Sequence, residues 1–367
     1  MTLSLLVLTA GCVSGEIDTS PTTDTGVIDT LGDSGTPTTD SGASDSGPTD
    51  SGVTDSGLTE TVDVPLLFSG GDTANLTAGT FPLLLSGDEF FVEDAVASTP
   101  AEDGATIAVP IPDTADLYEI SDNAPGLLAM LYAGLAWEDL DADGSHDEGT
   151  EAIAGVVGEH SLIYLGGEVA RYGITEGFYI LYESVLGETV FADLSFGLDI
   201  AVYDPDRELT LAGTSANLPP AGDAAVALVP LTMLQGSPAS PLEDGEPSEA
   251  WSFNVSGEPP SDHTVDITDE RGRTLRLGYE VPLAYRDTDG SGSFDTSDAP
   301  LGVACEGANA AVGIFVYPPR YRDYAFYFSS SGLNLGWSAL GAVTGSDDTE
   351  PVENPTALVI DPTACSL

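Results

Sequence analysis

Short apolar segments, each four to eight residues long, alternate with Gly, Pro and Asp from residue 61 onward. They are rich in β-branched and aromatic residues, which favours strands over helices. Turn residues separate neighbouring segments, and this spacing favours antiparallel pairing over βαβ units. The expected strands are 62–68, 81–85, 105–111, 161–165, 178–182, 198–203, 208–212 and 224–231, followed by 251–255, 264–267, 274–277, 281–285, 312–317, 324–328 and 357–360. The pattern predicts an all-β protein with two antiparallel β-sandwich-like domains.

The segment 236–249 is rich in Pro, Ser, Gly and Glu, and it separates the two series of expected strands. We therefore expect one domain over 61–235 and a second over 250–367. The segment 127–135 fits two patterns, because its apolar residues suit a helical face and also alternate as in a strand. A strand is favoured, since the residues that follow it belong to an internal repeat.

The internal repeat is an acidic motif that occurs at 135–151 and again at 283–298, and the two copies align without a gap. Positions 1, 3, 5 and 9 carry oxygen-bearing side chains, and position 6 is glycine. These residues are Asp139, Asp141, Asp143, Asp147 and Gly144 in the first copy, and Asp287, Asp289, Ser291, Asp295 and Gly292 in the second. Alternate side chains of a tight loop converge on one centre, and a hard cation such as Ca²⁺ binds about six to eight oxygens. The motif thus predicts two calcium sites.

Backbone carbonyls and a closing carboxylate complete the expected ligand sets. The carbonyls of Ser145 and Ser293, at position 7, would add one ligand each. Asp298 stands at position 12 of the second copy, where a closing carboxylate belongs. The first copy has Thr there, and either Glu148 or Glu151 is left to close it. The alternative is a pair of solvated Asp/Gly turns, although carboxylates gathered without a cation repel one another.

The Asp-x-Asp-x-[Asp/Ser]-Gly-x-x-Asp core resembles the calcium loops of EF-hands and dockerins. Its expected strand-loop-strand setting, with apolar residues at 153–156 and 301–303 after the loops, is similar to the calcium-stiffened B-type repeats of surface adhesins. The resemblance implies side-chain ligands at positions 1, 3, 5 and 9 of both copies and at Asp298. Position 8 is usually apolar in EF-hands, and here it is His146 or Phe294. Because EF-hand helices are not expected on either side, a structural clamp is favoured over a sensor.

The N-terminus carries a short apolar run, residues 3–8, which is too short to span a bilayer. It leads into Leu-Thr-Ala-Gly-Cys, ending at Cys12, which resembles a bacterial lipobox. The resemblance implies a signal peptide over 1–11, lipidation of Cys12, and a membrane anchor, and Val13 resembles the residue that directs lipoproteins to the outer membrane and the cell surface. Residues 12–60 repeat Asp, Ser, Thr and Gly with few apolar residues, which predicts a disordered linker.

Charge narrows the range of partners. The chain has 61 Asp and Glu against 8 basic residues, a formal net charge of −53. All basic residues are arginines, and they form no stripe that could neutralise a phosphate backbone, so nucleic-acid binding is excluded. A carboxylate-rich surface without lysine also resembles proteins of saline habitats, where salt screens the repulsion between like charges.

The cysteines and histidines offer no catalytic pattern. Beyond Cys12 there are only Cys305 and Cys365, and an exported chain favours a disulfide between them over two free thiols. His146, His160 and His263 lie far apart and fit no zinc motif. A nucleophile elbow, a phosphate loop and a dinucleotide fingerprint are all missing from the sequence. No catalytic residue is predicted.

The features together predict a lipid-anchored, calcium-stabilised protein of the cell envelope with a non-enzymatic role in adhesion or as a scaffold. The alternative is a carbohydrate-binding protein or a hydrolase that acts on extracellular polymer. The aromatic segment 317–328, which includes Arg320 and Arg322, would serve a glycan or protein partner if exposed, or the core and its rim if it forms a strand.

Overall fold

The computed structural model describes residues 60–367, apart from 87–88, 120–123, 184–188, 220–223, 235–238, 245–249, 270, 308, 331–332, 343–348, 353 and 364–367. The expected signal segment, the lipidation site Cys12, the linker as far as residue 59, and Cys365 all lie outside the described residues. Those expectations therefore stay predictions.

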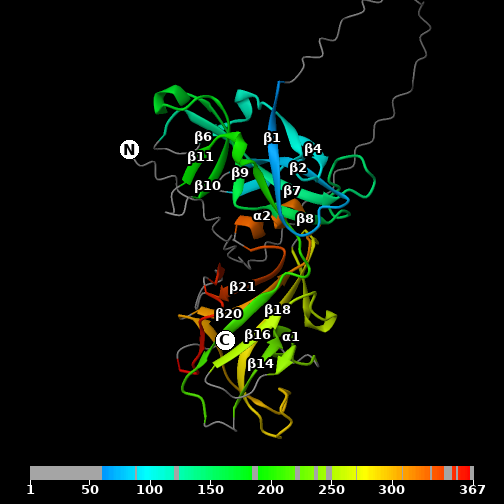
Figure 1. Cartoon of the computed structure of the whole chain (residues 1–367), viewed down its shortest axis with the longest axis vertical. Coiled ribbons are helices and arrows are strands. Elements are labelled where there is room, and N and C mark those ends of the chain that lie inside the picture. Colours follow the sequence, from blue (N-terminus) through cyan, green and yellow to red (C-terminus); the bar gives the residue numbers. More distant parts are fainter. Residues whose placement is uncertain are drawn as a thin grey trace, which may run out of the picture. The chain divides into compact units, whose positions relative to one another are not determined.

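Strands dominate the described residues and form two sheets, shown in Figure 1. The first sheet has 12 strands: β1 (Thr61–Gly70), β2 (Leu76–Ser86), β3 (Glu89–Val92), β4 (Ala97–Pro100), β5 (Thr106–Pro110), β6 (Tyr118–Glu119), β7 (Leu127–Glu138), β8 (Ile153–Val157), β9 (His160–Gly167), β10 (Gly177–Glu183), β11 (Thr189–Ala192) and β12 (Leu198–Val202). The all-β class expected from the sequence is confirmed.

The second sheet has 11 strands: β13 (Leu209–Ser215), β14 (Ala225–Pro230), β15 (Glu243–Asp244), β16 (Ala250–Val255), β17 (Thr264–Thr268), β18 (Thr274–Arg286), β19 (Ala299–Glu306), β20 (Asn309–Val316), β21 (Gly336–Ala342), β22 (Thr349–Pro351) and β23 (Leu358–Ile360). Helices are short in the described part of the chain: α1 (Leu231–Leu234), α2 (Arg322–Ser330), and the 3-10 turns η1 (Thr114–Asp116), η2 (Val169–Tyr172), η3 (Leu194–Phe196) and η4 (Ser261–His263).

The two sheets repeat one topology. In the first, β7 pairs with β2, β6, β8 and β9, and β9 continues through β10 to β11. In the second, β18 pairs in the same way with β14, β17, β19 and β20, and β20 continues through β21 to β22. The short helices follow this order too, because η1 and η4 precede β6 and β17, while η2 and α2 precede β10 and β21. We call β1–β12 the first repeat and β13–β23 the second.

Each repeat contains one parallel pair, which the sequence pattern did not indicate. The first and last strands of a repeat lie side by side and run parallel, β1 with β12 and β13 with β23. The other pairings among the described residues are antiparallel. A parallel pair needs a long connection, and here the whole repeat provides it.

The chain passes from one sheet to the other between Val202 and Leu209. Strands β13 and β14 therefore belong to the second sheet, not to the first series in which the sequence analysis placed them. The Pro- and Gly-rich segment 236–249 lies within the second repeat, between α1 and β16. The connection between the two sheets is only a few residues long, so its amino-acid composition gives little indication of a boundary. All described residues belong to one compact unit.

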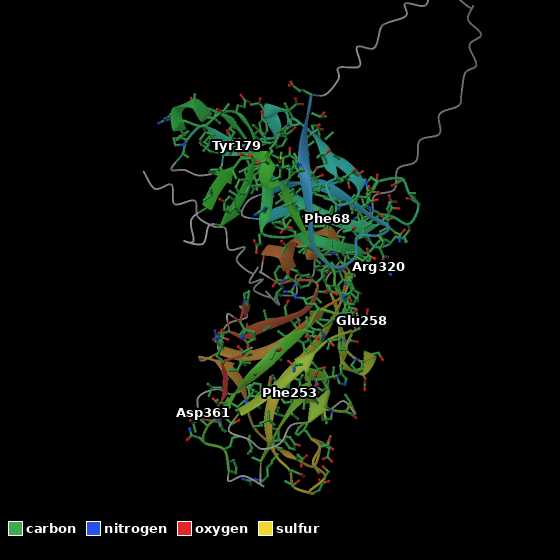
Figure 2. The ribbon with its side chains drawn as sticks, viewed as in Figure 1. Phe68, Tyr179, Phe253, Glu258, Arg320 and Asp361 are labelled. Carbon is green, nitrogen blue, oxygen red and sulfur yellow. The ribbon has the colours of Figure 1, made fainter. Side chains whose placement is uncertain are left out.

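Alternate strand residues face a core inside each repeat. In the first repeat, Val64 of β1 and Ile107 of β5 share one buried cluster with Tyr132 of β7 and Leu162 of β9. The sheet therefore curls over its own buried face, as a sandwich-like fold requires. Phe253, labelled in Figure 2, belongs to the corresponding cluster of the second repeat.

Two segments had sequence patterns that fit more than one role, and one of them forms a strand while the other forms a helix. The segment 127–135 lies in strand β7, so the favoured interpretation is confirmed. The segment 324–328 was expected to be a strand, and that prediction is wrong, because it lies in helix α2. Ala325 and Phe328, three residues apart, are buried in one cluster with Ile153 of β8. This burial of one helical face outweighs the strand preference of Tyr and Phe.

A buried acid–base pair holds η4 against β18. His263 is 3% exposed and Glu280 is fully buried, and His263 Nδ1 lies 2.7 Å from Glu280 Oε1. Burial of the ring lowers the pKa of His263, but the hydrogen bond and charge of Glu280, with smaller effects of Asp262 and the Ser240 backbone, outweigh it and raise the pKa above 6.5. Burial also raises the pKa of Glu280, although His263 opposes this. This contact satisfies the hydrogen-bonding need of the buried His263 Nδ1.

The pair predicts that stability falls on the alkaline side of neutrality. A group whose pKa is raised by folding adds stability below its unfolded pKa and loses it as the pH rises through the folded pKa. Both groups have raised pKa values, so we expect the free energy of unfolding to fall as the pH rises from 6 to 8, by at most about 1.4 kcal/mol per pH unit for one proton. Urea unfolding of the wild type and Glu280→Gln would measure it. Equal pH slopes for the two proteins would contradict the prediction.

Candidate metal centres

Two acidic loops occupy equivalent places in the two repeats. Loop 1 (residues 139–151) joins β7 to β8, and loop 2 (residues 287–298) joins β18 to β19. The strand pairing shifts register just before each loop, between Ala136 and Trp137 and between Ala284 and Tyr285. A bulge of this kind increases the local twist and redirects the end of the strand. The repeat seen in the sequence is therefore also a repeat of local structure.

The first carboxylate of each loop binds the backbone of position 6. Asp139 Oδ2 accepts the N–H of Gly144 at 3.0 Å, and Asp287 Oδ2 accepts the N–H of Gly292 at 2.9 Å. Asp287 also accepts the N–H of Gly290 at 2.7 Å. These backbone donors, that of Gly292 foremost, hold the pKa of Asp287 below its usual value. The carboxylate is thus kept charged at neutral pH, as a cation ligand must be.

Both loops adopt left-handed backbone conformations at positions 4 and 6. At position 6, Gly144 and Gly292 each have φ of +79°. At position 4, Ala142 has φ of +60° and Gly290 has φ of +73°. Glycine takes this conformation without steric cost, which accounts for the glycine at position 6 of both motifs. The matching φ values show that the two loops wind in the same way.

A buried carboxylate closes loop 1. Glu151 is 1% exposed, and its Oε1 accepts the N–H of Leu140 at 2.6 Å while its Oε2 accepts the N–H of Asp147 at 2.9 Å. These donors stand at positions 2 and 9 of the loop. One side chain therefore ties both ends of loop 1 together.

Asp298 closes loop 2 through the same two positions. Its Oδ1 accepts the N–H of Thr288 at 2.8 Å, and its Oδ2 accepts the N–H of Asp295 at 3.0 Å. Glu151 comes one residue later in its loop than Asp298, and the extra methylene of Glu spans that difference. Glu151, rather than Glu148, thus makes the hydrogen bonds in loop 1 that Asp298 makes in loop 2, and a role for either residue as a cation ligand stays a prediction. Glu148 instead forms an ion pair with Arg322.

An aromatic side chain at the end of the preceding strand donates a hydrogen bond to a backbone carbonyl of each loop. Trp137 and Tyr285, both fully buried, stand two residues before the first Asp. Trp137 Nε1 donates to the carbonyl of Ser145 at 3.1 Å, and the Tyr285 hydroxyl donates to the carbonyl of Gly292 at 3.3 Å. Neither ring was expected from the sequence to support a loop, although both copies of the motif carry an aromatic residue there.

The residue at position 8 packs on that ring. The His146 ring meets Trp137 edge-on at 6.1 Å between centroids, and Phe294 meets Tyr285 in the same manner at 5.2 Å. Burial lowers the pKa of His146, and its Nε2 lies 3.2 Å from the Glu151 carbonyl oxygen. His146 therefore takes the place of an apolar residue as a neutral buried ring.

Each loop gathers three carboxylates at one point. The oxygens of Asp139, Asp141 and Asp143 lie within 4.8 Å of one another, and so do those of Asp287, Asp289 and Asp298. Oxygens that share one Ca²⁺ at about 2.3–2.6 Å are at most about 5 Å apart, so both groups are close enough to bind one ion. Asp139 Oδ1 is in addition buried without a hydrogen-bond partner. The two groups can hold a metal ion.

Other residues of the predicted ligand sets are engaged within the loops. Asp147 and Asp295 are not members of the two groups of the described residues, and the hydrogen bonds from Ser297 lower the pKa of Asp295. The Ser145 carbonyl accepts from Trp137, and the Ser293 carbonyl accepts from the Ser291 hydroxyl at 2.9 Å. A carbonyl oxygen has two lone pairs, so these bonds leave it able to bind an ion as well.

Cys305 is buried and forms a disulfide bond. It lies in β19, the strand that follows loop 2. Its expected partner Cys365 lies outside the described residues, so that pairing stays a prediction. His160, the third histidine, packs on the surface-exposed ring of Phe196 and on Tyr182.

A polar cavity of about 510 Å³ lies between β12 and the segment that follows α2. Glu159, Asp199, Arg207 and Asn334 are among the residues that line it, and no aromatic ring is. None of these lining residues belongs to loop 1 or loop 2, so the cavity is separate from the two acidic groups.

Comparison of the chain with protein-family models gave no match, and comparisons with curated proteins and with solved structures gave no significant match either. In the part of the chain that the structure describes, no helix has the length and apolar character needed to cross a membrane.

Proposed function

We propose that each acidic loop binds one Ca²⁺ and that the ion is a structural part of its repeat. The observation that carries this proposal is the occurrence of one loop architecture at the same place in both repeats, each with three aspartate oxygens within 4.8 Å. A solvated Asp/Gly turn would not need the same closing carboxylate, the same aromatic support and the same left-handed positions twice.

Calcium fits the donor set better than the other common metals. The two groups consist of carboxylates alone, without the Cys or His ligands that zinc prefers. Asp141, Asp143 and Asp289 are exposed side chains on a loop, which suits the flexible coordination of Ca²⁺ more than the strict octahedron of Mg²⁺.

A structural role fits better than a sensor role. A sensor EF-hand opens a groove between two helices, whereas each loop here joins two paired strands.

We further propose that the chain is anchored through a lipid on Cys12 at the cell envelope, on the outer membrane surface, and serves in adhesion or as a scaffold. The lipobox-like motif and the acidic linker support this proposal. A radiolabelled fatty acid should enter the wild-type chain in a bacterial host and not the Cys12→Ala variant. Failure to label the wild type would contradict the anchor.

Calcium titration by calorimetry on the full chain tests the metal sites. We expect two bound ions for the wild type, one each for Asp141→Asn and Asp289→Asn, and none for the double variant, with Kd between about 1 µM and 1 mM. Asp103→Asn, in the exposed turn between β4 and β5, removes the same charge outside both loops and should leave two ions bound. A wild type that binds no Ca²⁺ at about 10 mM would overturn the proposal.

A further inference from the structure

Loop 1 is joined by backbone hydrogen bonds to the second repeat. The N–H of Gly149, in loop 1, donates to the carbonyl of Arg320 at 2.8 Å, and the N–H of Ile153, just after the loop, donates to that of Pro319 at 2.8 Å. Arg320 is labelled in Figure 2. A side chain at position 149 would lie 3.3 Å from the Tyr321 hydroxyl, and φ of +79° there also favours glycine. The end of loop 1 is therefore fitted to the segment 319–322.

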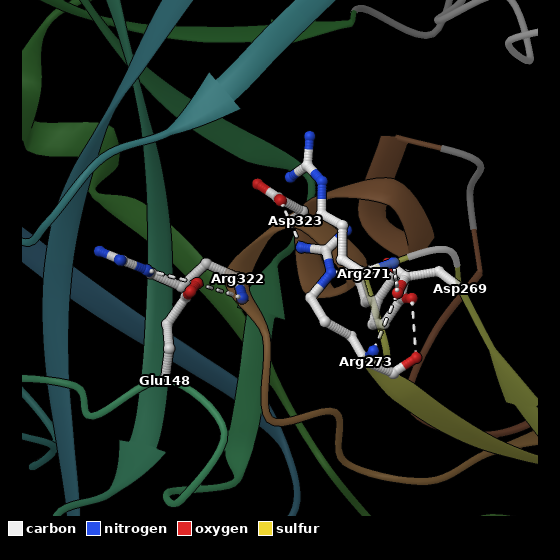
Figure 3. A network of polar contacts seen from close by, with 7 residues as sticks. Glu148, Asp269, Arg271, Arg273, Arg322 and Asp323 are labelled. Atoms are coloured by element: carbon white, nitrogen blue, oxygen red, sulfur yellow. Dashed lines mark hydrogen bonds and ion pairs between the residues drawn. The ribbon is translucent and has the colours of Figure 1, made fainter. Parts of the chain in front are cut away.

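Arg322 connects the two repeats at the same place. Its side chain is only 11% exposed, and its Nε lies 3.0 Å from Glu148 Oε1 of loop 1 (Figure 3). Its Nη1 lies 2.6 Å from Asp94 Oδ1. Nη1 also donates to the carbonyl of Glu93 at 2.7 Å. Hydrogen bonds to charged partners are stronger than neutral ones. Solvent screens the pair with Asp94, which is 90% exposed, more than the pair with Glu148, which is 37% exposed. One arginine of α2 thus holds both loop 1 and the connection after β3.

The helix that carries Arg322 is itself fixed within the second repeat. Arg273 Nη1 lies 2.7 Å from Asp323 of α2, and Arg273 Nε lies 2.7 Å from Asp269 (Figure 3). Beneath these charges, Ala325 and Phe328 of α2 share a buried cluster with Trp137, the ring that supports loop 1. Movement of loop 1 relative to the second repeat would therefore disturb both polar and apolar contacts.

The aspartates of loop 2, in contrast, make their hydrogen bonds within loop 2. The hydrogen bonds of Asp287, Asp289, Asp295 and Asp298 all go to residues 288–297 of the same loop. A Cβ atom added at Gly290 or Gly292 would have no neighbour within 4 Å. Two loops with the same internal structure thus differ in what they contact.

We propose that cation binding at loop 1 is coupled to the docking of the second repeat, and that Arg322 carries this coupling, whereas loop 2 acts on its own repeat only. The inference rests on the calcium sites proposed above. In loop 1 the buried Asp139 Oδ1 without a hydrogen-bond partner points independently to a cation. The cation holds the loop in the conformation that presents Glu148 and Gly149 to the second repeat, and docking favours that conformation in return, because linkage between two binding events is reciprocal.

The test measures the two sites separately in the full chain. Asp289→Asn leaves loop 1 as the binding site, and Asp141→Asn leaves loop 2. Adding Arg322→Gln should weaken calcium binding at loop 1 by about 5–10-fold and change binding at loop 2 by less than about 2-fold. Glu148→Gln, which removes the partner from the other side, should act as Arg322→Gln does. Arg276→Gln breaks the exposed pair with Asp266 and should change neither site.

Hydrogen exchange supplies the reciprocal measurement. The amides of Gly149 and Ile153 donate to the second repeat, so their exchange reports docking directly. Calcium should slow both amides in Asp289→Asn and not in Asp289→Asn/Arg322→Gln. Equal weakening of both sites by Arg322→Gln, or no weakening of either, would overturn the coupling while the calcium sites stand. A wild type that binds no calcium would overturn the calcium sites and the coupling with them.

Discussion

Trp137→Ala is expected to lower the free energy of unfolding by about 3–5 kcal/mol, the usual cost of removing a fully buried large aromatic side chain. Trp137 is fully buried, and its ring packs against Phe81 at 5.5 Å between centroids and against His146. Its Nε1 also donates to the Ser145 carbonyl of loop 1. The variant should therefore lose the cation at loop 1 as well as stability. Urea unfolding and calcium titration measure the two effects.

Conservative variants separate packing from hydrogen bonding. Trp137→Phe keeps a ring but loses the N–H, and it should cost less than the alanine variant while still weakening loop 1. Tyr285→Phe removes the hydroxyl that donates to the Gly292 carbonyl, and a loss of about 0.5–1.5 kcal/mol is expected with loop 1 unchanged. A loss below about 1 kcal/mol for Trp137→Ala would contradict the view that this ring supports the loop.

The strands were largely predictable from the sequence because they bury one face. Alternation in β1 and β16, for example, places every second residue in the core, and both strands were expected. The central part of β7 was harder, since it is buried on both faces and loses clear alternation. Helix α2 was misjudged, because its aromatic residues favour a strand locally and only contact with β8, far away in the sequence, selects the helix.

The duplication of the fold was only partly visible in the sequence. The motif before and within the loops is repeated because a cation site restricts residue type at fixed positions. Core positions elsewhere accept any apolar residue of suitable volume, so equivalent strands drift apart in sequence while their pairing is kept. The register that pairs β18 with β14 and β7 with β2 depends on distant contacts, which periodicity does not report.

The predicted ligand residues lie close together where they alternate along the loop. Asp139, Asp141 and Asp143 converge as the spacing indicated. The closing residue of loop 1 could not be chosen from spacing, because Glu151 lies one residue beyond the expected position and its longer side chain makes up the difference. The role of Arg322 was also beyond the sequence, since it acts across the two repeats.

Removal of calcium is expected to lower the melting temperature of the full chain by about 5–10 °C per site. An ion at 100 times its Kd stabilises the folded state by about 2.7 kcal/mol, and about 1 kcal/mol shifts the melting temperature by about 2–4 °C in proteins of this size class. Without the ion, three neighbouring aspartates per loop also repel one another. Calorimetric melting in calcium and in EDTA at equal ionic strength measures the shift.

Added monovalent salt separates this effect from the general acidity of the chain. Sodium chloride screens repulsion among all 61 acidic residues, so it should raise the melting temperature of the wild type and of Asp141→Asn/Asp289→Asn alike. Calcium at low concentration should act only where at least one loop keeps its aspartates. The double variant should therefore not respond to EDTA, and Asp103→Asn should respond as the wild type does. Equal EDTA responses in the wild type and the double variant would contradict the sites. Because loop 1 contacts the other repeat, whereas the aspartates of loop 2 hydrogen-bond within their own loop, Asp141→Asn should lower the cooperativity of melting more than Asp289→Asn.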